Sequence, residues 1–189
     1  MTVTQNSIFE PDGRAVPYFD EGDGPTLVLI PGRGHDAEAL GTVSAILEEE
    51  GFRIIRIGYR GQVDGVDVRE LASDALDVID HLGLGDTWVG GHGFGGTVAR
   101  EIALRSHERI NGLLLLGVED VPVDLAPDVP VLIFQGENDD VTPPVNAEKL
   151  RDTAPDRASI TTIVGAGHLF PATHPLETAE DIAEYLDWD

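Results

Sequence analysis

The chain has 189 residues, a length typical of one domain with a substantial core, and 41% of the residues are hydrophobic. Its formal net charge is −23, from 35 acidic and 12 basic residues, of which only Lys149 is a lysine. This surplus of negative charge repels polyphosphates and anionic lipids, so composition argues against nucleic-acid binding and against membrane binding.

The chain contains no cysteine, which excludes disulfide bonds, thiolate metal sites and a cysteine nucleophile. No apolar run approaches the roughly 18 residues of a membrane-spanning helix. The first ten residues show neither a basic start nor an apolar segment, so no secretory signal is expected and a cytoplasmic location is the default. We interpret the negative charge as a solvated acidic surface, with a field that steers cationic ligands as the alternative.

Strands and helices alternate along the whole chain, a pattern typical of an α/β fold with a mostly parallel sheet and helices on both faces. A strand pair is expected at residues 7–10 and 16–20, around a turn at Asp12 and Gly13. Thr26–Ile30 is apolar throughout, as a strand buried on both faces requires. A helix is expected over residues 37–49, closed by Gly51, before a strand at residues 52–57.

The second half of the chain continues this alternation. Apolar residues at helical spacing predict a helix over Val68–His81, and a second helix is predicted over Phe94–Ser106. Strands are predicted at residues 87–89, 112–117, 130–134 and 159–164, and helices at residues 145–153 and 176–186. No repeat, low-complexity tract or linker interrupts the order, so residues 1–189 are expected to form a single domain.

A glycine-rich turn, Gly91-His92-Gly93-Phe94-Gly95, lies between a predicted strand and a predicted helix. It resembles the nucleophile elbow of the α/β-hydrolase superfamily, which has the pattern G-x-S-x-G on a strand–turn–helix. Glycine stands at position 93, where that pattern has the attacking serine. The resemblance implies the scaffold of a serine hydrolase whose nucleophile is absent, through engineering or natural loss.

Two further features resemble the oxyanion hole of that superfamily. The segment Leu29-Ile-Pro-Gly-Arg-Gly34 follows an apolar strand, as the oxyanion loop does. The resemblance implies that the backbone N–H of Arg33 is one oxyanion donor. The backbone N–H of Phe94, at a helix N-terminus suited to developing negative charge, would be the other.

The acid and the base of the superfamily also have counterparts, in the expected chain order. Residues 131–140 resemble the strand and loop that carry the acid, where Gly136 and Asp139 fit the pattern G-x-x-D and Asp140 is the alternative. Residues 164–168 resemble the loop that carries the catalytic histidine, His168. The resemblance implies that Asp139 orients His168 and that His168 takes the proton of a nucleophile.

Three other side chains near these motifs have two interpretations each. His35 follows the oxyanion loop and is either a substrate contact or an ordinary residue at a helix start. His92 is a second possible substrate contact, although its place on the buried side of the elbow favours a structural role. Thr97 lies one turn into the helix, too far along to replace a hydroxyl at position 93.

The segment between the strand at residues 112–117 and Pro130 is too short for the helical lid of many superfamily members. The resemblance is therefore to a small, lidless, serine-esterase-like member. Its site is expected to be open or covered by a partner subunit, and so a homo-oligomer is compatible with the sequence. An open site suits polar or bulky substrates better than long lipid chains.

Three functions follow from these observations, each with a small-molecule substrate or ligand. The first is an ester-type hydrolase scaffold with Gly93 in place of serine. The second is a non-serine enzyme in which Asp139 and His168 activate water, or shuttle protons for a lyase, cyclase or isomerase reaction. The third is a ligand-binding protein that has the fold without the chemistry.

No metal and no organic cofactor are implied, because the sequence has no cluster of metal ligands and no P-loop. Gly91, Gly93 and Gly96 match the dinucleotide-binding pattern G-x-G-x-x-G. The ribose-binding acid that should follow about twenty residues later is absent, so this match is weak.

Overall fold

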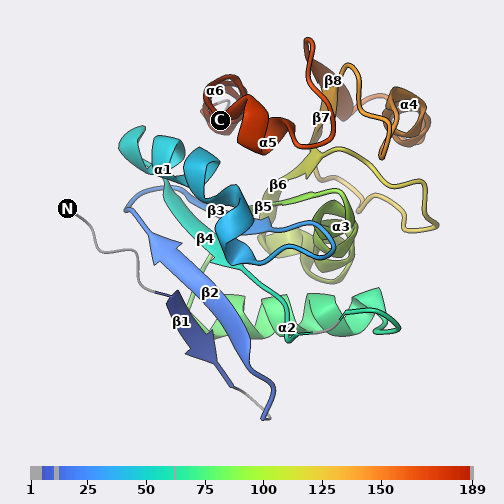
Figure 1. The fold of residues 1–189 in the computed structure, drawn as a ribbon. Helices are drawn as coiled ribbons and strands as arrows, with labels where there is room; N and C mark the ends of the chain where they lie inside the picture. Colours follow the sequence, from blue (N-terminus) through green and yellow to red (C-terminus); the bar gives the residue numbers. More distant parts are fainter. Residues whose placement is uncertain (1–5, 11–12, 62, 188–189) are drawn as a thin grey trace.

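The computed structural model describes residues 6–10, 13–61 and 63–187. In these residues eight strands form one sheet with the order β1-β2-β4-β3-β5-β6-β7-β8, and helices cover both of its faces (Figure 1). The first two strands are antiparallel, and β2 pairs with β4 in the same sense. The other neighbours are parallel. The predicted fold class, an α/β-hydrolase fold with a mostly parallel sheet, is confirmed.

The strands are β1 Asn6–Phe9, β2 Val16–Glu21, β3 Thr26–Ile30, β4 Arg53–Ile57, β5 Thr87–His92, β6 Ile110–Leu116, β7 Val131–Gly136 and β8 Ala158–Ile163. The α-helices are α1 Gly41–Glu49, α2 Val68–His81, α3 Phe94–Ser106, α4 Pro144–Asp152, α5 Phe170–Thr173 and α6 Pro175–Leu186. Two short 3₁₀ helices, η1 Ala37–Leu40 and η2 His107–Arg109, complete the described secondary structure.

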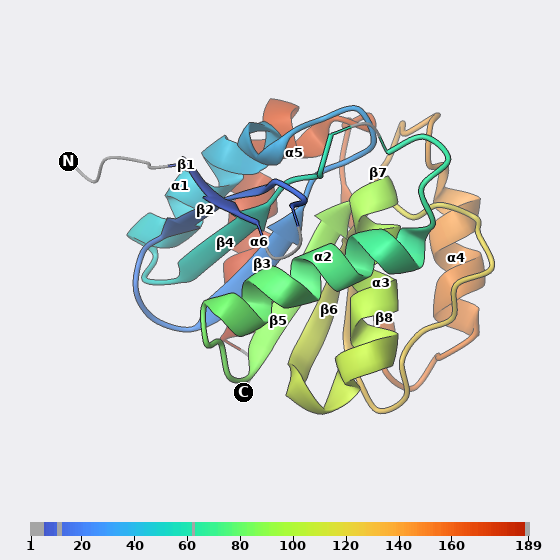
Figure 2. The ribbon, with the colours of Figure 1, turned by 90° about the horizontal axis from the view of Figure 1, so that it is seen from below.

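The sheet separates two hydrophobic cores, because successive side chains of a strand point to opposite faces. In β3, Val28 packs with α2 and α3, whereas Leu29 packs with α1 and α6. In β7, Ile133 and Phe134 divide in the same way. Figure 2 shows α2 and α3 across one face of the sheet, with α1 and α6 behind it.

Most element boundaries agree with the sequence pattern, and the differences have local causes. The predicted helix at residues 37–49 is divided into η1 and α1, because the Asp36 carboxylate accepts the backbone N–H of Glu38 (3.0 Å) and begins a tighter turn. Gly51 closes α1 with a φ of +96°, as expected. The short helix α5 was not predicted, and the expected turn residue Asp12 lies outside the described residues.

Strand β5 continues three residues beyond its predicted end, through two glycines and His92. Glycine has low strand propensity, but Gly90 and Gly91 are held on both sides, by β3 and by β6. The parallel strands β3, β5, β6, β7 and β8 all end at one edge of the sheet. Ligand sites of open α/β sheets lie at this edge. Here the candidate site residues lie at the ends of these strands or in the turns, loops and helix start that follow them.

No helix covers this edge between β6 and β7. Residues 117–130 form an irregular segment that contacts α3, where the Thr97 hydroxyl donates to Glu119 and the Arg100 guanidinium donates to the carbonyl of Val123. The expected absence of a lid domain is therefore confirmed for this segment.

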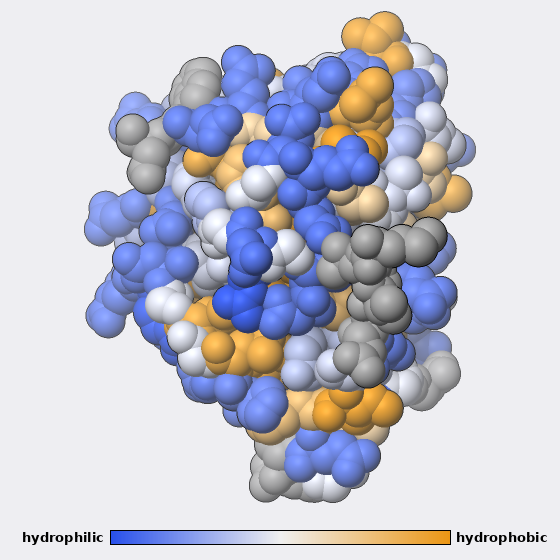
Figure 3. All heavy atoms as spheres, turned by 90° about the vertical axis from the view of Figure 1, so that its left-hand side faces the viewer, coloured by the Kyte–Doolittle hydropathy of each residue, from blue (hydrophilic) through white to orange (hydrophobic). Residues whose placement is uncertain are grey.

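The net charge of −23 predicts a mostly hydrophilic surface. Figure 3 shows this for the side that carries β1, β2 and α1, where the apolar patches are separate. Among the described residues, no helix combines the length and the apolar character needed to span a bilayer.

The turn between β5 and α3 packs backbone against backbone. A Cβ atom at Gly95 would lie 2.2 Å from the carbonyl oxygen of Ile30 and 2.5 Å from that of Pro31. A Cβ atom at Gly91 would lie 2.2 Å from the backbone of Gly95. Only glycine allows this approach, which brings the N-terminus of α3 against the end of β3.

We expect Gly95→Ala to lower the free energy of unfolding by about 1–3 kcal/mol, because the added methyl group displaces backbone that cannot move independently. The higher helix propensity of alanine is too small to offset this loss. Urea unfolding of the variant measures the effect. Gly85→Ala is the control, since a Cβ at this exposed turn meets no atom within 4 Å. Equal stability of both variants would contradict the proposed packing.

Candidate active site

Gly93 lies between the last residue of β5 and the first residue of α3. Its φ of +54° and ψ of −113° fall in a region that L side chains rarely adopt. Its N–H donates to the carbonyl of Leu116 (2.9 Å), and its carbonyl accepts the N–H of Gly96 (3.0 Å). The neighbouring strand and the helix therefore hold this conformation in place. It matches the sharp strand-to-helix turn on which a nucleophile elbow exposes its side chain.

The space beside Gly93 faces one side chain. A Cβ atom built at this position would lie 3.4 Å from both Cε1 and Nε2 of His168. In the described part of the chain, no other atom outside the adjoining residues lies within 4 Å of it. A side chain at position 93 would thus point at the imidazole nitrogen that can accept a proton.

The other imidazole nitrogen of His168 contacts Asp139. The Nδ1 atom lies 2.9 Å from Oδ2 of Asp139, whose side chain is fully buried, whereas that of His168 is 19% exposed. The two residues come from the loops after β7 and β8, which are adjacent parallel strands. This contact fixes Nε2 as the free nitrogen of the imidazole, on the side of Gly93.

The sequence analysis missed Thr142, which joins the same network. Its hydroxyl lies 2.7 Å from Oδ2 of Asp139 and 3.0 Å from Nδ1 of His168. Since a carboxylate oxygen only accepts, the hydroxyl donates to Asp139 and accepts from the Nδ1–H of His168. The backbone N–H groups of Val141 and Thr142 donate to the other carboxylate oxygen (2.9 and 2.8 Å).

These contacts decide the charge of Asp139. Burial raises the pKa of its carboxyl group, but hydrogen bonds from the hydroxyl and N–H of Thr142 and from His168 outweigh burial and hold the pKa below its ordinary value of 3.8. Asp139 is therefore ionised at neutral pH. Asp140, the alternative acid in the sequence, is exposed on the same loop.

His92 lies behind His168, away from solvent. Its Nε2 is 2.7 Å from the carbonyl oxygen of His168, so Nε2 carries a proton and donates it. The two imidazole rings stack with centroids 4.5 Å apart. Burial, followed by the proximity of His168, lowers the pKa of His92 to about 4, and the ring is neutral at neutral pH. The contacts of His92 thus position His168.

The two predicted oxyanion donors lie at the ends of adjacent strands, β3 and β5. Within the described chain, the backbone N–H groups of Arg33 and Phe94 have no hydrogen-bond acceptor. The Arg33 guanidinium lies 3.9 Å above the ring of Phe94, so the two residues are in direct contact. They leave two unpaired donors beside Gly93, one of them at the N-terminus of α3.

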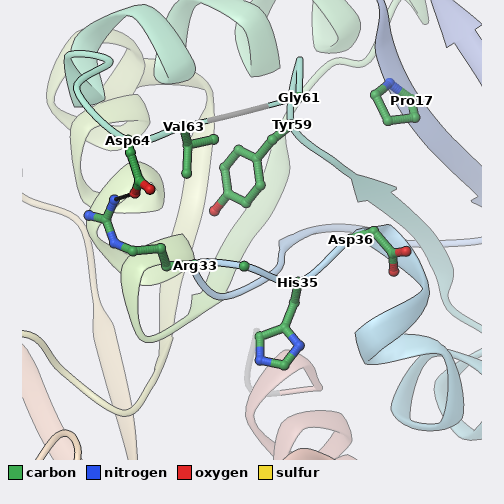
Figure 4. Close-up of a pocket in the computed structure, with 9 residues that line it drawn as sticks. Pro17, Arg33, His35, Asp36, Tyr59, Gly61, Val63 and Asp64 are labelled. Carbon is green, nitrogen blue, oxygen red and sulfur yellow. Dashed lines mark ion pairs between the residues drawn. The ribbon is translucent and has the colours of Figure 1, made fainter.

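Arg33 lines two cavities. One, of about 510 Å³, extends towards β2 and β4 (Figure 4). In Figure 4, Arg33 pairs with Asp64 (3.6 Å), Tyr59 points between them, and the ring of His35 points away from both. His35 is exposed, and it lines a smaller cavity of about 230 Å³ together with His92 and Leu169. The structure thus places His35 at the rim of the site.

The second cavity beside Arg33, of about 450 Å³, adjoins Phe94 and Thr97. Thr97 is buried and donates to Glu119 rather than facing position 93. Within the described ranges, no group of three histidine, aspartate or glutamate side chains is arranged to hold a metal ion.

Comparison with known proteins agrees with this fold. Residues 26–171 match the model of the alpha/beta hydrolase family. A segment of 143 residues is 28% identical to the soluble epoxide hydrolase of Corynebacterium sp. (strain C12), covering 68% of this chain and 50% of that protein. Another comparison gives 32% identity over 136 residues to a non-heme haloperoxidase of Rhodococcus erythropolis, covering 66% and 50%. The chain spans about half the length of these curated relatives.

Two solved esterase structures are similar in fold. That of the thermophilic esterase from Thermogutta terrifontis gives a TM-score of 0.83 at 21% identity, covering 96% of this chain and 98% of that one. The esterase of Exiguobacterium antarcticum gives a TM-score of 0.85 at 19% identity, with coverages of 96% and 99%. At these identities the similarity concerns the fold alone.

We expect Thr142→Val to raise the pKa of Asp139 towards its ordinary value and to lower the free energy of unfolding at neutral pH by about 1–3 kcal/mol, because a buried carboxylate loses a donor. Since the folded pKa of Asp139 lies below the unfolded value, its ionised form stabilises the fold above the unfolded pKa. That contribution disappears as pH falls through the folded pKa. The stability difference between variant and parent should therefore shrink in acid.

Carbon-detected NMR titration of the carboxyl group and urea unfolding at neutral and acid pH measure both effects. Thr173→Val is the matched control, since that exposed hydroxyl also contacts an imidazole, that of His174 (2.8 Å). An unchanged titration of Asp139 in Thr142→Val would show that the hydroxyl does not stabilise the carboxylate.

Proposed function

Because the chain belongs to the alpha/beta hydrolase family, we propose that it is an ester-type hydrolase scaffold in which Gly93 occupies the position of the nucleophile. Asp139, His168 and the oxyanion donors Arg33 and Phe94 remain around that position. With glycine at position 93, the chain would bind an ester and polarise its carbonyl group without forming a covalent acyl intermediate.

One observation carries this proposal: among the described atoms outside the adjoining residues, only Cε1 and Nε2 of His168 lie within 4 Å of the Cβ position at Gly93. A serine side chain there would direct its hydroxyl at Nε2, which could take the proton while the oxygen attacks a carbonyl carbon. The developing oxyanion would be stabilised by the N–H groups of Arg33 and Phe94 and by the N-terminus of α3. Asp139 would stabilise the imidazolium that forms.

The open space between Gly93 and His168 favours a second candidate function, in which water is the nucleophile. Glycine leaves Nε2 of His168 open to a water molecule, which the imidazole can deprotonate as it attacks the carbonyl carbon of a bound ester. The C–O bond to the alcohol then breaks, and the imidazolium returns the proton to the leaving oxygen. The acid–base pair needs no change for this reaction, since its contacts do not involve residue 93.

We expect Gly93→Ser to hydrolyse a short activated ester on the order of 10³-fold faster than the chain with Gly93, because a covalent route becomes available. Gly93→Ala is the matched control. It has the same backbone strain at a φ of +54° and adds the same Cβ, but it has no hydroxyl. Release of p-nitrophenol from p-nitrophenyl acetate gives the rates, and circular dichroism verifies that each variant is folded.

The chain with Gly93, Gly93→Ser and Gly93→Ala together distinguish the serine scaffold from the candidate in which water is the nucleophile. Activity in Gly93→Ser alone, abolished by adding His168→Ala, supports the serine scaffold. Activity in the chain with Gly93 that His168→Ala abolishes, and that Gly93→Ala reduces by filling the water position, supports the second candidate. A folded but inactive Gly93→Ser would contradict the proposed scaffold.

A further inference from the structure

The cavity of about 450 Å³ beside Phe94 offers a subsite for one substituent of a bound ester. It lies between the start of α2, the first turns of α3 and the segment after β6. Its apolar walls come from Val66, Val68, Phe94, Val121, Pro122 and Val123. Four charged side chains and the hydroxyl of Thr97 complete the lining. Both proposed oxyanion donors belong to this lining, so the cavity opens directly beside the reaction centre.

Glu119 places a carboxylate in this cavity, close to position 93. It follows β6 by three residues, at the same edge of the sheet as the candidate site. Its Oε1 accepts the hydroxyl of Thr97 (2.7 Å), which lies four residues after Gly93 on α3. Four residues of α-helix rise about 6 Å, so the carboxylate lies roughly one helical turn from the position of the nucleophile.

The carboxylate of Glu119 differs from the other charged groups that line the cavity. Arg33 pairs with Asp64 (3.6 Å), Arg69 with Asp67 (2.8 Å), and Glu101 with Arg105 (3.7 Å). Within the part of the chain that the structure describes, the carboxylate of Glu119 is in no ion pair, and its partner is a neutral hydroxyl.

Arg100 also lies near Glu119, but its guanidinium group is directed at backbone carbonyl groups. It is 3% exposed and donates to the carbonyl oxygens of Glu119 (3.4 Å) and Val123. It attracts the carboxylate from behind the wall of the cavity without pairing with it. A cation of suitable length inside the cavity could therefore pair with Glu119.

We propose that this cavity selects esters whose substituent is a short apolar chain ending in a cation, which pairs with Glu119. The inference rests on the proposed function of the same site. The apolar walls would pack against the chain, and about four or five bonds would span the helical turn between the carbonyl carbon and the carboxylate. The net charge of −23 would attract such a substrate to the protein.

The test compares two p-nitrophenyl esters of the same shape in the Gly93→Ser background. One has a pentanoyl chain with a terminal trimethylammonium group, and the other has carbon in place of the quaternary nitrogen. We expect kcat/KM to be about fivefold higher for the cationic ester, mainly through KM, as is typical of a partly solvated ion pair. Added Glu119→Gln, which can still accept from Thr97, should abolish this preference, and salt should weaken it.

Asp120→Asn is the matched control for total charge. Asp120 is adjacent in sequence, exposed, and paired with Lys149 (3.0 Å) outside this cavity. If Asp120→Asn reduces the preference for the cationic ester as much as Glu119→Gln does, the overall electrostatic field of the protein is responsible and the proposed subsite is wrong. Hydrolysis of both esters at equal rates would also overturn the subsite, while leaving the proposed function intact.

A binding measurement decides the subsite even if Gly93→Ser is inactive, which would contradict the proposed function alone. Butyltrimethylammonium is titrated into the chain with Gly93 and observed by amide NMR. We expect saturable shifts at Thr97, Glu119 and Val121 that are lost in Glu119→Gln and retained in Asp120→Asn. No saturable shift at these residues in the parent chain would overturn the inference.

Discussion

The close approach of α3 to the end of β3 is the constraint on which the site depends. The N-terminus of α3 can reach the loop after β3 only because Gly91 and Gly95 have no side chains, since Cβ atoms at these positions would overlap backbone carbonyl groups. This contact sets the direction of the turn at Gly93 and thus the side chain it would present to His168. It also leaves the N–H groups of Arg33 and Phe94 beside that turn. Glycine therefore has two distinct roles here. Gly91 and Gly95 allow backbone packing and Gly93 allows the turn geometry, whereas the absence of a hydroxyl concerns position 93 alone.

The acid–base pair depends on a different part of the fold. Asp139 and His168 meet because β7 and β8 are adjacent and end at the same edge. Thr142 and the backbone of the loop saturate both carboxylate oxygens, and His92 supports His168 from the opposite side. None of these contacts uses residue 93. The geometry of the imidazole is thus fixed by its own surroundings, whichever residue stands at the elbow.

The sequence predicted the parts of the molecule that depend on local pattern. Helices α2 and α3 have the expected bounds, because their apolar periodicity and their flanking residues determine them locally. The resemblance of the motifs to those of the α/β-hydrolase superfamily also implied that Gly93, Asp139 and His168 would be brought together. It did not predict the extension of β5, since its glycines are held in the sheet by strands distant in the chain. In the sequence, Thr142 has the pattern of an ordinary loop residue. Its contact with His168, 26 residues away, forms only when β8 packs beside β7.

The independence of the acid–base pair from residue 93 has an evolutionary consequence. Because Asp139 and His168 are held by Thr142, the loop backbone and His92, exchanging serine and glycine at the elbow does not weaken their contacts. The glycine codons GGU and GGC differ at a single base from the serine codons AGU and AGC. Under the proposed function, a covalent and a non-covalent form of this protein would therefore be neighbours in genetic terms. A lineage could move between them in either direction without rebuilding the rest of the site.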